Sequence, residues 1–588
     1  MKILFEPMGK VAEGSGSIIE IARASGVSIR SDCGGKGICG KCKVLVINGK
    51  FSELTEHERK KLNETEIKQG YRLSCQAEIL SDATVFVPAE SRGEVRKIED
   101  ATIDKEVELN PAVVKIRLKL NTPTLEDPKP DVERLSEAIK NVEIPLSLLR
   151  KLPDLLRSFS WDFSAVLWKN RLIAIESPNS EIYGVAVDIG SSKIVCHLVN
   201  LANGKTIAKA FAENPQVAYG EDVVSRITYA KKDENLAKLQ QIVVETVNDL
   251  ITKLCKEAGI SKENVYEVMV VGNSVMHHLF FGITPKFIGV SPFIPAVRRS
   301  ISYPANEVGL RIAENGIVTS LPLIAGFIGA DATANLLLTE IYKSEEVAMV
   351  IDVGTNTEII LGNRERVIAC STPSGPAFEG AHISSGMKAV SGAIEKIRIK
   401  DEDVFYSTID NKKPKGICGS GLIDLIAELY KNNYINKFGK FKRDGRRIVH
   451  EEVPKFVVAF SDETEFGKSI TVTEKDINEF LLAKASIKAG WSILAKRFNV
   501  EPEKIEKIYL AGSFGKHIDI ENARLIGLLP KSGEIVFAGD SAVAGAKIAL
   551  KSIKKREEIE EVVKKVEYVE LSIEKDFQTT FLRSIPLG

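Results

Sequence analysis

The sequence lacks an excess of charge of either sign. It contains 80 Lys and Arg and 80 Asp and Glu residues, so its formal net charge at pH 7 is zero. Proteins that bind nucleic acids or anionic membrane surfaces without sequence preference rely on a cationic face. We therefore expect neither nucleic acid nor a membrane among its partners.

Long hydrophobic runs are also missing. A transmembrane helix needs about 20 predominantly apolar residues, and the best stretch, residues 321–338, is interrupted by Asp331 and Asn335. The opening residues, MKILFEP, are typical of a first β-strand and lack the flanks of a secretory signal peptide. We expect a cytoplasmic protein without a transmembrane helix.

Cysteine is scarce and unevenly distributed. Four of the eight cysteines lie before residue 76, and none follows Cys418. Disulfides are rare in the cytoplasm, so clustered cysteines there indicate metal or redox chemistry. The four scattered cysteines are expected to be small buried hydrophobic residues: Cys196, Cys255, Cys370 and Cys418.

The chain is longer than a single hydrophobic core usually serves. Its 588 residues, 44% of them hydrophobic and 27% charged, are ordinary for a globular protein and predict three or four domains. Changes of pattern along the chain suggest a cysteine-containing domain at 1–90, a linker at 91–104, a small α+β domain at 105–180 and a large domain at 181–588.

The first segment contains the glycine-rich loop SDCGGKGICGKC. Cys33, Cys39 and Cys42 share this loop, and Cys75 follows in YRLSCQ. Four thiolates are the usual ligands of a [2Fe–2S] cluster, and glycine lets the backbone wrap closely and point N–H groups at the sulfurs. Structural zinc usually takes two close cysteine pairs, so the isolated Cys75 favours iron–sulfur over zinc.

The surroundings of this loop resemble ferredoxins of the plant and adrenodoxin type. Five residues separate Cys33 from Cys39, which is closer to the adrenodoxin variant than to the four-residue plant spacing. The resemblance implies a β-grasp domain whose cluster carries one electron at a time. Three strands and one helix are predicted around the loop: strands at 2–5, 42–47 and 84–87, and a helix at 18–24.

The next two segments carry no recognisable chemistry. Residues 91–104 are charged and poor in aromatics, which predicts a flexible tether for the electron carrier; an ordered connector is the alternative. Residues 105–180 combine the strand-like alternation VVKIRLKL with helix-like stretches and a final pair of strands. We interpret this small domain as a structural spacer or docking domain.

The large domain contains one pattern twice. YGVAVDIGSSKIVCHLVNL and VAMVIDVGTNTEIIL each show an apolar strand ending in Asp, a glycine turn, hydroxyl residues and a second apolar strand. Glycine allows close approach to a phosphate, and the turn's N–H and hydroxyl groups can donate to its oxygens. Two copies in matching contexts indicate two related halves that face each other across a cleft.

These hairpins predict the residues of a nucleotide site. Asp188 and Asp352 can hold Mg²⁺ directly or through water. Asp331, in a later strand–glycine–helix junction, is either an acid near the γ-phosphate or a helix cap. The phosphates are expected to contact residues of both hairpins: Gly190, Ser191, Ser192, Lys193, Gly354, Thr355, Asn356 and Thr357.

A third glycine turn lies in KIYLAGSFGKHID, residues 507–519. Its spacing fits neither a Walker A loop nor a Rossmann motif. It resembles the adenosine-binding element of the superfamily of actin, heat-shock chaperone ATPases and sugar kinases, and the paired hairpins resemble that superfamily's phosphate motifs. The resemblance implies a two-lobed α/β ATPase domain that binds ATP and Mg²⁺, and it adds Gly512, Ser513 and Gly515 to the site.

Two other features of the large domain are open to interpretation. The loop CSTPSGPAFEGAHISSGM, residues 370–387, is long and rich in Ser and Gly, and such loops tend to be functional; it is either a surface for a partner or a lid over the ATP site. His277 and His278 open a helix without an acidic or thiol partner nearby in sequence, which favours packing over metal binding.

A ferredoxin-like domain fused to such an ATPase resembles the reductive activators of corrinoid proteins, of the RACo and RamA type, across essentially the whole chain. The RamA branch carries a C-terminal [4Fe–4S] module, and no cysteine follows Cys418, which favours the RACo branch. The resemblance implies ATP-dependent transfer of one electron from the [2Fe–2S] cluster to a Co(II) corrinoid protein. It also implies a low-potential electron donor and a homodimer formed through the ATPase domain.

Other functions fit parts of the sequence. A small-molecule kinase with a fused redox domain would use the same hairpins. An activator of another low-potential enzyme, such as a 2-hydroxyacyl-CoA dehydratase, would hold a [4Fe–4S] cluster between subunits, for which Cys370 or Cys418 would have to serve. An actin-like filament or a chaperone would leave the cysteine-containing domain without a role.

Overall fold

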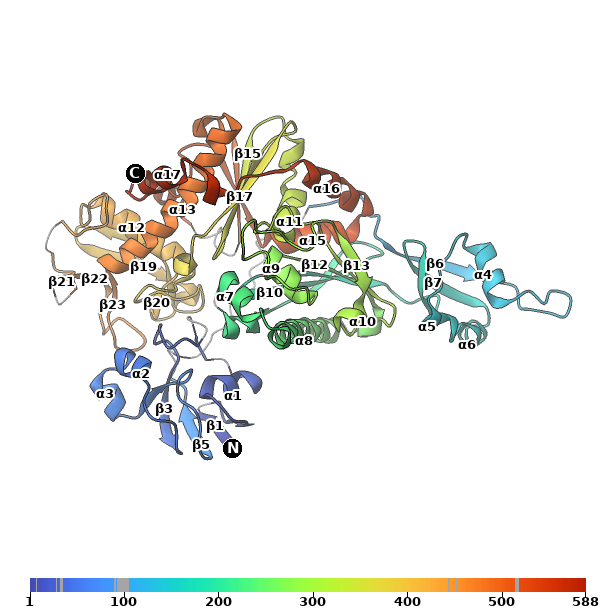
Figure 1. The fold of residues 1–588 in the computed structure, drawn as a ribbon, viewed down its shortest axis with the longest axis horizontal. Coiled ribbons are helices and arrows are strands. Elements are labelled where there is room, and N and C mark those ends of the chain that lie inside the picture. The colour runs from blue at the N-terminus through green and yellow to red at the C-terminus, as the bar shows by residue number, and fades with distance from the viewer. Residues whose placement is uncertain are drawn as a thin grey trace.

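The computed structural model describes residues 1–6, 8–27, 29–31, 35–88, 91, 105–220, 222–442, 445–450, 453–512 and 518–588. The N-terminal domain lies beneath the two lobes of the large domain, and the small domain projects to the side (Figure 1). Apart from Ser91, the predicted tether at 91–104 falls outside the described residues.

The N-terminal domain is a five-stranded mixed sheet with the strand order β2-β1-β5-β3-β4. Strand β1 pairs antiparallel with β2 and parallel with β5, and α1 buries an apolar face in the domain's core. This arrangement confirms the predicted β-grasp domain. The element bounds are β1 Lys2–Glu6, β2 Lys10–Glu13, α1 Ile18–Ala24, β3 Lys43–Asn48, α2 Glu56–Lys61, α3 Glu64–Lys68, β4 Tyr71–Leu73 and β5 Ala83–Phe86.

The small domain is a three-stranded antiparallel sheet with three short helices. Leu135, Leu152 and Leu156 of the helices pack with Phe163 and Leu172 of the sheet in one buried cluster. It has the α+β composition that the sequence predicts. Its elements are β6 Val113–Lys119, α4 Asp131–Ala138, α5 Leu146–Leu149, α6 Leu152–Ser158, β7 Asp162–Trp168 and β8 Arg171–Glu176.

The two lobes of the large domain repeat one topology. Lobe one is built on a sheet of order β11-β10-β9-β12-β14-β13, and lobe two on a sheet of order β25-β24-β15-β16-β17-β26. In each lobe the first hairpin strand (β9 or β15) pairs antiparallel with the second and parallel with a strand that comes much later (β12 or β24). The two related halves predicted from the repeated pattern are confirmed.

The strands of these lobes have the following bounds. In lobe one they are β9 Tyr183–Ile189, β10 Lys193–Asn200, β11 Thr206–Glu213, β12 Val265–Gly272, β13 Ile301–Pro304 and β14 Ile317–Ser320. The main sheet of lobe two has β15 Ala348–Val353, β16 Thr357–Gly362, β17 Val367–Thr372, β24 Lys507–Ala511, β25 Glu534–Gly539 and β26 Glu567–Tyr568. Two small sheets of lobe two contain β18 Ala393–Lys400, β19 Asp403–Thr408, β20 Gly416–Ile417, β21 Ile448–Val449, β22 Lys455–Ala459 and β23 Ile470–Thr473.

Helices α11 and α15 cross in the core between the sheets. A Cβ at Gly545 would lie 2.0 Å from the Ala334 carbonyl oxygen, so this contact requires glycine. The helices of the large domain are α7 Val223–Tyr229, α8 Asp233–Ala258, α9 Ser274–Phe280, α10 Ala305–Val308, α11 Ala330–Thr339, α12 Gly419–Lys431, α13 Glu474–Phe498, α14 Ile520–Leu525, α15 Ser541–Lys551, α16 Ile553–Lys565 and α17 Phe577–Ser584. Within the described part of the chain, no helix has the length and apolarity needed to cross a membrane.

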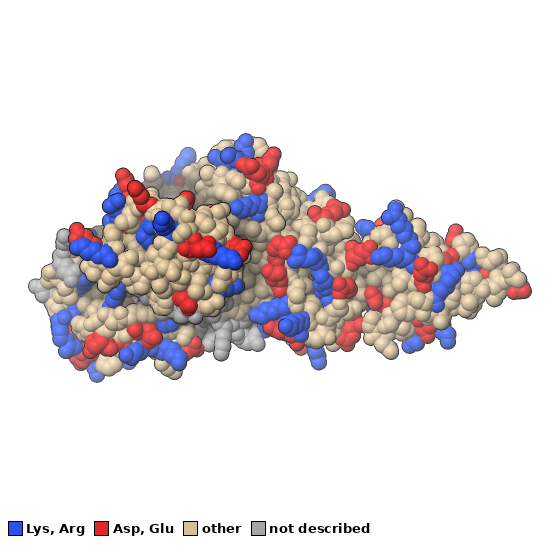
Figure 2. Space-filling model, turned by 90° about the horizontal axis from the view of Figure 1, so that it is seen from below, with Lys and Arg blue, Asp and Glu red and all other residues tan. Residues whose placement is uncertain are grey.

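Charged side chains of both signs intermix over the face drawn in Figure 2, without a large area of one sign. This distribution agrees with the balanced composition.

A buried ion pair joins the small domain, lobe one and α16. Both guanidinium NH groups of Arg556 donate to the Glu267 carboxylate at 2.7 and 2.8 Å. Trp168 of the small domain donates to the same carboxylate at 3.0 Å. The side chain of Glu267 is fully buried, so these donors replace the hydrogen bonds that it would make with water.

We expect Arg556→Ala to lower the free energy of unfolding by about 3–5 kcal/mol, because it leaves a buried carboxylate without its cation. Urea-induced unfolding followed by circular dichroism measures the change. Arg311→Ala is the control, since it removes a half-exposed pair with Glu245 and should cost at most about 1 kcal/mol. Equal costs for the two variants would contradict the role given to Glu267.

Candidate nucleotide and cluster sites

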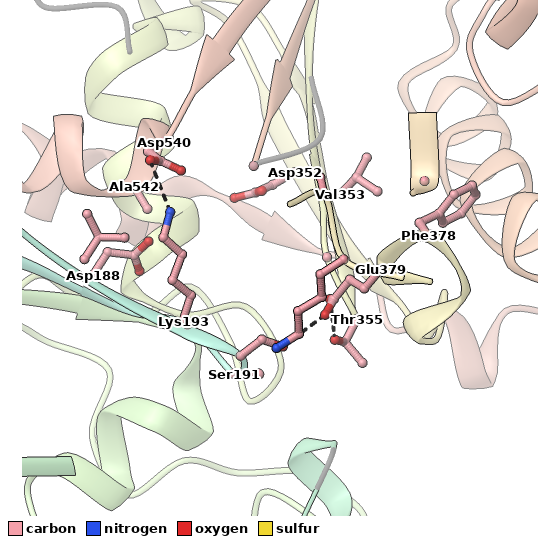
Figure 3. Close-up of a pocket in the computed structure, with 18 of the residues that line it drawn as sticks. Asp188, Ser191, Lys193, Asp352, Val353, Thr355, Phe378, Glu379, Asp540 and Ala542 are labelled. Atoms are coloured by element: carbon pink, nitrogen blue, oxygen red, sulfur yellow. Dashed lines mark hydrogen bonds and ion pairs between the residues drawn. The ribbon is translucent and has the colours of Figure 1, made fainter. Parts of the chain in front are cut away.

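The first hairpin lines one wall of a cleft of about 310 Å³ between the lobes (Figure 3). The Gly190 N–H donates to the Lys193 carbonyl at 2.9 Å and closes the turn. Asn273, which caps α9, donates to the Ser191 hydroxyl at 3.2 Å. Lys193 reaches across to Asp540, with 3.7 Å between Nζ and Oδ2. All five residues predicted in this hairpin line the cleft: Asp188, Gly190, Ser191, Ser192 and Lys193.

The second hairpin lines the opposite wall. Asp352, Gly354, Thr355 and Asn356 all border the cleft. Thr357 is different: it is buried, it does not border the cleft, and its hydroxyl lies 2.8 Å from that of Ser374. Thr357 therefore stabilises the turn of the second hairpin on the side that faces away from the cleft.

The third predicted turn is described only at its start. Gly512 borders the cleft with φ +88°, and a Cβ there would lie 2.8 Å from the Val353 carbonyl oxygen. Glycine is therefore required where β24 meets the second hairpin. Ser513 and Gly515 fall outside the described residues.

Carboxylates from both lobes crowd the centre of the cleft. Burial, then repulsion from Asp331 and Asp352, raises the pKa of Asp188. Burial and repulsion from Asp352 raise the pKa of Asp331 to about 7. Burial raises the pKa of Asp352, although the Asn335 amide donates to it at 2.7 Å. A divalent cation relieves repulsion of this kind. The described carboxylates are not grouped closely enough to hold a metal ion by three direct ligands, so the cluster suits an Mg²⁺ that is bound partly through water.

The structure places Asp331 where it can serve in either of the two roles that the sequence left open. It stands in the first turn of α11 and accepts from the Ala332 N–H at 2.8 Å, which is a helix-terminus interaction. It also borders the cleft beside the other carboxylates.

Sequence reasoning missed five acidic residues that border the cleft: Glu213, Glu358, Glu379, Glu395 and Asp540. Glu358 is buried, and burial followed by repulsion from Asp331 raises its pKa. Asp540 precedes α15, and Glu379 comes from the loop at 370–387. Glu358 directly follows the second hairpin's turn and Asp540 follows a strand and a glycine, so the sequence pattern could have identified both as site residues. No such pattern surrounds Glu379.

The predicted cluster ligands are partly described. Cys42 and Cys75 have sulfurs 3.3 Å apart, and Cys39 lies on the same loop as Cys42, whereas Cys33 falls outside the described residues. A side chain at Gly37, with φ +73°, would meet His57 at 2.8 Å, so the close wrapping of the loop requires glycine. With Cys33 undescribed, the described residues contain no group of three or more His, Cys, Asp or Glu side chains placed to hold a metal ion.

The paired sulfurs and tight loop fit a cluster held by four cysteines. The hydrogen bond with Cys75, followed by burial, raises the pKa of the Cys42 thiol. The Gln76 amide donates to the Gly35 carbonyl at 3.0 Å and lies 3.7 Å from the Cys75 sulfur. Donors near the sulfurs tune a cluster's potential.

The remaining cysteines and the histidine pair are structural. All four scattered cysteines are buried, as predicted, so neither Cys370 nor Cys418 is exposed for a cluster shared between subunits. His277 lies 2.9 Å from the Ser320 hydroxyl, and His278 accepts from the Ala296 N–H at 3.0 Å. Both rings are buried.

Four family models match along the chain. They describe a 2Fe-2S iron-sulfur cluster binding domain at residues 9–80, the RACo linker region at 102–181, the RACo middle region at 183–344 and the C-terminal ASKHA domain of RACo at 346–587. The corrinoid activation enzyme RamQ of Eubacterium limosum is 31% identical over 100% of this chain and 99% of its own. This chain belongs to the RACo family.

Further relatives agree with this membership. A [Co(II) methylated amine-specific corrinoid protein] reductase of Methanosarcina barkeri is 27% identical over 66% of this chain and 73% of its own. The solved structure of a reductive activator for corrinoid, iron-sulfur protein superposes with a TM-score of 0.74 at 35% identity, covering 100% of this chain and 98% of its own. The predicted RACo resemblance is confirmed, as is the [2Fe–2S] domain, and the ASKHA domain implies ATP and Mg²⁺.

We expect the apparent affinity of the cleft for Mg²⁺ to rise by up to about tenfold between pH 6 and pH 8. Mg²⁺ binds the ionised carboxylate, and a carboxyl with a pKa of about 7 is mostly protonated at pH 6 and mostly ionised at pH 8. Mg²⁺ titrations of ATP hydrolysis at several pH values measure this.

Asp331→Asn is the matched control, since it keeps the size of the side chain and removes the titrating group. Its Mg²⁺ affinity should be weaker and nearly independent of pH in this range. A pH dependence as steep as that of the unmodified protein would show that Asp331 is not the group responsible.

Proposed function

We propose that this chain is an ATP-dependent reductive activator, which transfers one electron to the Co(II) corrinoid of a methyl-transfer protein and restores Co(I). The supporting observation is that the [2Fe–2S] domain contacts both lobes of the nucleotide cleft. Lys36 donates to the Ser225 hydroxyl of lobe one at 3.2 Å, and Lys41 donates to the Ser384 carbonyl of lobe two at 3.1 Å. A relative named as a corrinoid activation enzyme and a solved structure named as a reductive activator for corrinoid, iron-sulfur protein both align over the whole chain.

The nucleotide's phosphates would lie between the hairpins. The turns at Gly190 and Gly354 offer backbone N–H groups, the hydroxyls of Ser191, Ser192 and Thr355 are further donors, and Lys193 adds a positive charge. The carboxylates of Asp188, Asp331 and Asp352 would hold Mg²⁺ directly or through water. The N-terminus of α15, at Ser541, also borders the cleft and favours negative charge.

The four cysteines of the N-terminal domain would hold the cluster, and the cluster supplies one-electron transfer. The loop from Gly35 to Cys42 keeps it near the surface that faces the lobes, since Lys36 and Lys41 make contacts there. Gln76 would donate to the Cys75 thiolate and adjust the potential.

Coupling to ATP would supply the free energy needed to transfer the electron to an acceptor of lower potential. Moving one electron against 100 mV costs about 2.3 kcal/mol, so a shortfall of a few hundred millivolts is within the range of coupled ATP binding and hydrolysis. ATP need only favour one state of the activator–corrinoid complex through its differential affinity. Our hypothesis is that docking changes the cobalt's coordination and raises its potential, and that ATP hydrolysis releases the reduced partner.

We also propose a low-potential electron donor and a homodimer formed through the ATPase domain, as the family resemblance implies. Sedimentation velocity of the holoprotein tests the dimer. A single species with the mass of one 64.5 kDa chain at micromolar concentration would overturn that part of the proposal.

We expect Mg-ATP to be required for reduction of a Co(II) corrinoid protein. The holoprotein is reduced anaerobically with a low-potential donor, the corrinoid protein is added, and the Co(I) absorption is followed with and without Mg-ATP. Cys75→Ser should abolish the rise because it removes a predicted cluster ligand. Asp352→Asn should slow it by about 10- to 1,000-fold, since it removes a carboxylate beside the reacting phosphate.

No rise with several corrinoid proteins, from a protein that holds its cluster and hydrolyses ATP, would contradict the proposal. Phosphorylation of a small molecule under the same conditions would favour the kinase alternative. Full reduction without ATP would contradict the ATP coupling alone.

A further inference from the structure

Glu379 joins the two phosphate hairpins across the cleft. Its two carboxylate oxygens accept from different lobes: Oε2 from the Ser192 hydroxyl at 3.0 Å and Oε1 from the Thr355 hydroxyl at 2.8 Å. Figure 3 shows the carboxylate beside Thr355, between the two walls. A negatively charged group therefore occupies the hydroxyl donors that the hairpins offer to phosphate oxygens.

On the side of lobe one, hydrogen bonds through α7 connect the hairpin to the N-terminal domain. Arg226 of α7 is buried and donates to the carbonyl of Ser191 in the hairpin. The neighbouring Ser225 receives the hydrogen bond from Lys36. Ser225 is itself held by Asp222, whose carboxylate accepts from its N–H at 2.7 Å and its hydroxyl at 2.9 Å.

On the side of lobe two, the link runs through the loop that carries Glu379. Ser384, five positions later, accepts from Lys41 through its carbonyl. Its N–H and hydroxyl both donate to Asp476 of α13, at 2.8 and 3.0 Å. The loop's start is tied to the second hairpin, because the Gly375 N–H donates to the Thr355 carbonyl at 2.9 Å.

We propose that Glu379 is an internal substitute for a nucleotide phosphate, and that its displacement by Mg-ATP weakens the docking of the cluster domain. Lys36 and Lys41 hold that domain to lobe one and lobe two respectively. Each acceptor is anchored to its own lobe, so a change in the spacing of the lobes strains one of the two contacts. Glu379 contributes to this spacing, since it accepts from one hydroxyl on each hairpin.

The physical basis is competition for the same donors. A phosphate oxygen and the Glu379 carboxylate are both anionic, so they repel each other and cannot share Ser192 and Thr355. By linkage, whatever stabilises the Glu379 bridge weakens nucleotide binding, and nucleotide weakens the bridge equally. This inference rests on the proposed ATP site, and it adds the residue through which the cleft and the cluster domain communicate.

The first test is nucleotide affinity. Glu379→Gln keeps the shape of the side chain and removes its charge, so we expect the Mg²⁺ complex of a non-hydrolysable ATP analogue to bind about three- to tenfold more tightly. Isothermal titration calorimetry on the holoprotein measures it. Glu213→Gln is the matched control, because it too removes one negative charge from the cleft. The Glu213 carboxylate forms an ion pair across the cleft with Lys388 at 2.6 Å. Within the described part of the chain, no hydrogen bond joins it to Ser192 or Thr355, whose hydroxyls both donate to Glu379.

A smaller change in Glu213→Gln than in Glu379→Gln supports the proposal. Unchanged or weaker affinity in Glu379→Gln overturns it, and weaker affinity would instead mark Glu379 as a ligand of Mg²⁺. If the unmodified protein binds no nucleotide, the proposed ATP site fails and this inference fails with it. Thermal unfolding of each variant checks that the fold is retained.

The second test measures the docking of the cluster domain on the lobes directly and does not depend on catalysis. Hydrogen–deuterium exchange of residues 35–42 in the holoprotein should increase when the nucleotide analogue binds, and should be increased in Glu379→Gln before it is added. A Lys36→Ala/Lys41→Ala variant should show the increased exchange from the start and little response to nucleotide. Tighter binding in Glu379→Gln with no change in exchange at 35–42 would overturn the proposed communication.

Discussion

Confined negative charge in the cleft is the constraint on which the rest of this protein depends. Asp188 comes from lobe one, and Asp352 and Glu358 from lobe two, while Asp331 stands at the start of a helix between them. Burial raises the pKa of each, and repulsion from a neighbouring carboxylate adds to this effect. The lobes therefore carry a local repulsion where they meet, and a divalent cation with an anionic partner is the ligand that relieves it.

Because both lobes have the same topology, a change at the cleft can move each lobe as a whole. Each hairpin lies at the end of a central strand and is braced by buried groups, such as Arg226 behind the first and Thr357 behind the second. A change in the distance between the hairpins is therefore a change in the distance between whole lobes. The cluster domain contacts both lobes, which gives the proposed coupling between the cleft and the electron carrier a physical route.

Several features were accessible from the sequence because they depend on local chemistry. Helix α1 has the predicted bounds, and the two hairpins recur as the same strand pair in both lobes. Thr357 matched the hairpin pattern yet faces Ser374 instead of the cleft, because alternate residues of a strand point to opposite sides. Glu379 could not be recognised, since an isolated Glu in a loop of Ser and Gly carries no periodic signal.

The sequence by itself determined the parts: the cysteine-rich loop, the two hairpins, the third glycine turn and their order. These rest on spacings of a few residues, over which backbone geometry leaves little choice. Only the tertiary structure decided which distant groups meet. Glu379 reaches Ser192 across 187 positions, and Lys41 reaches Ser384 across 343. Such contacts follow from the packing of both lobes and the cluster domain together, which no local pattern encodes.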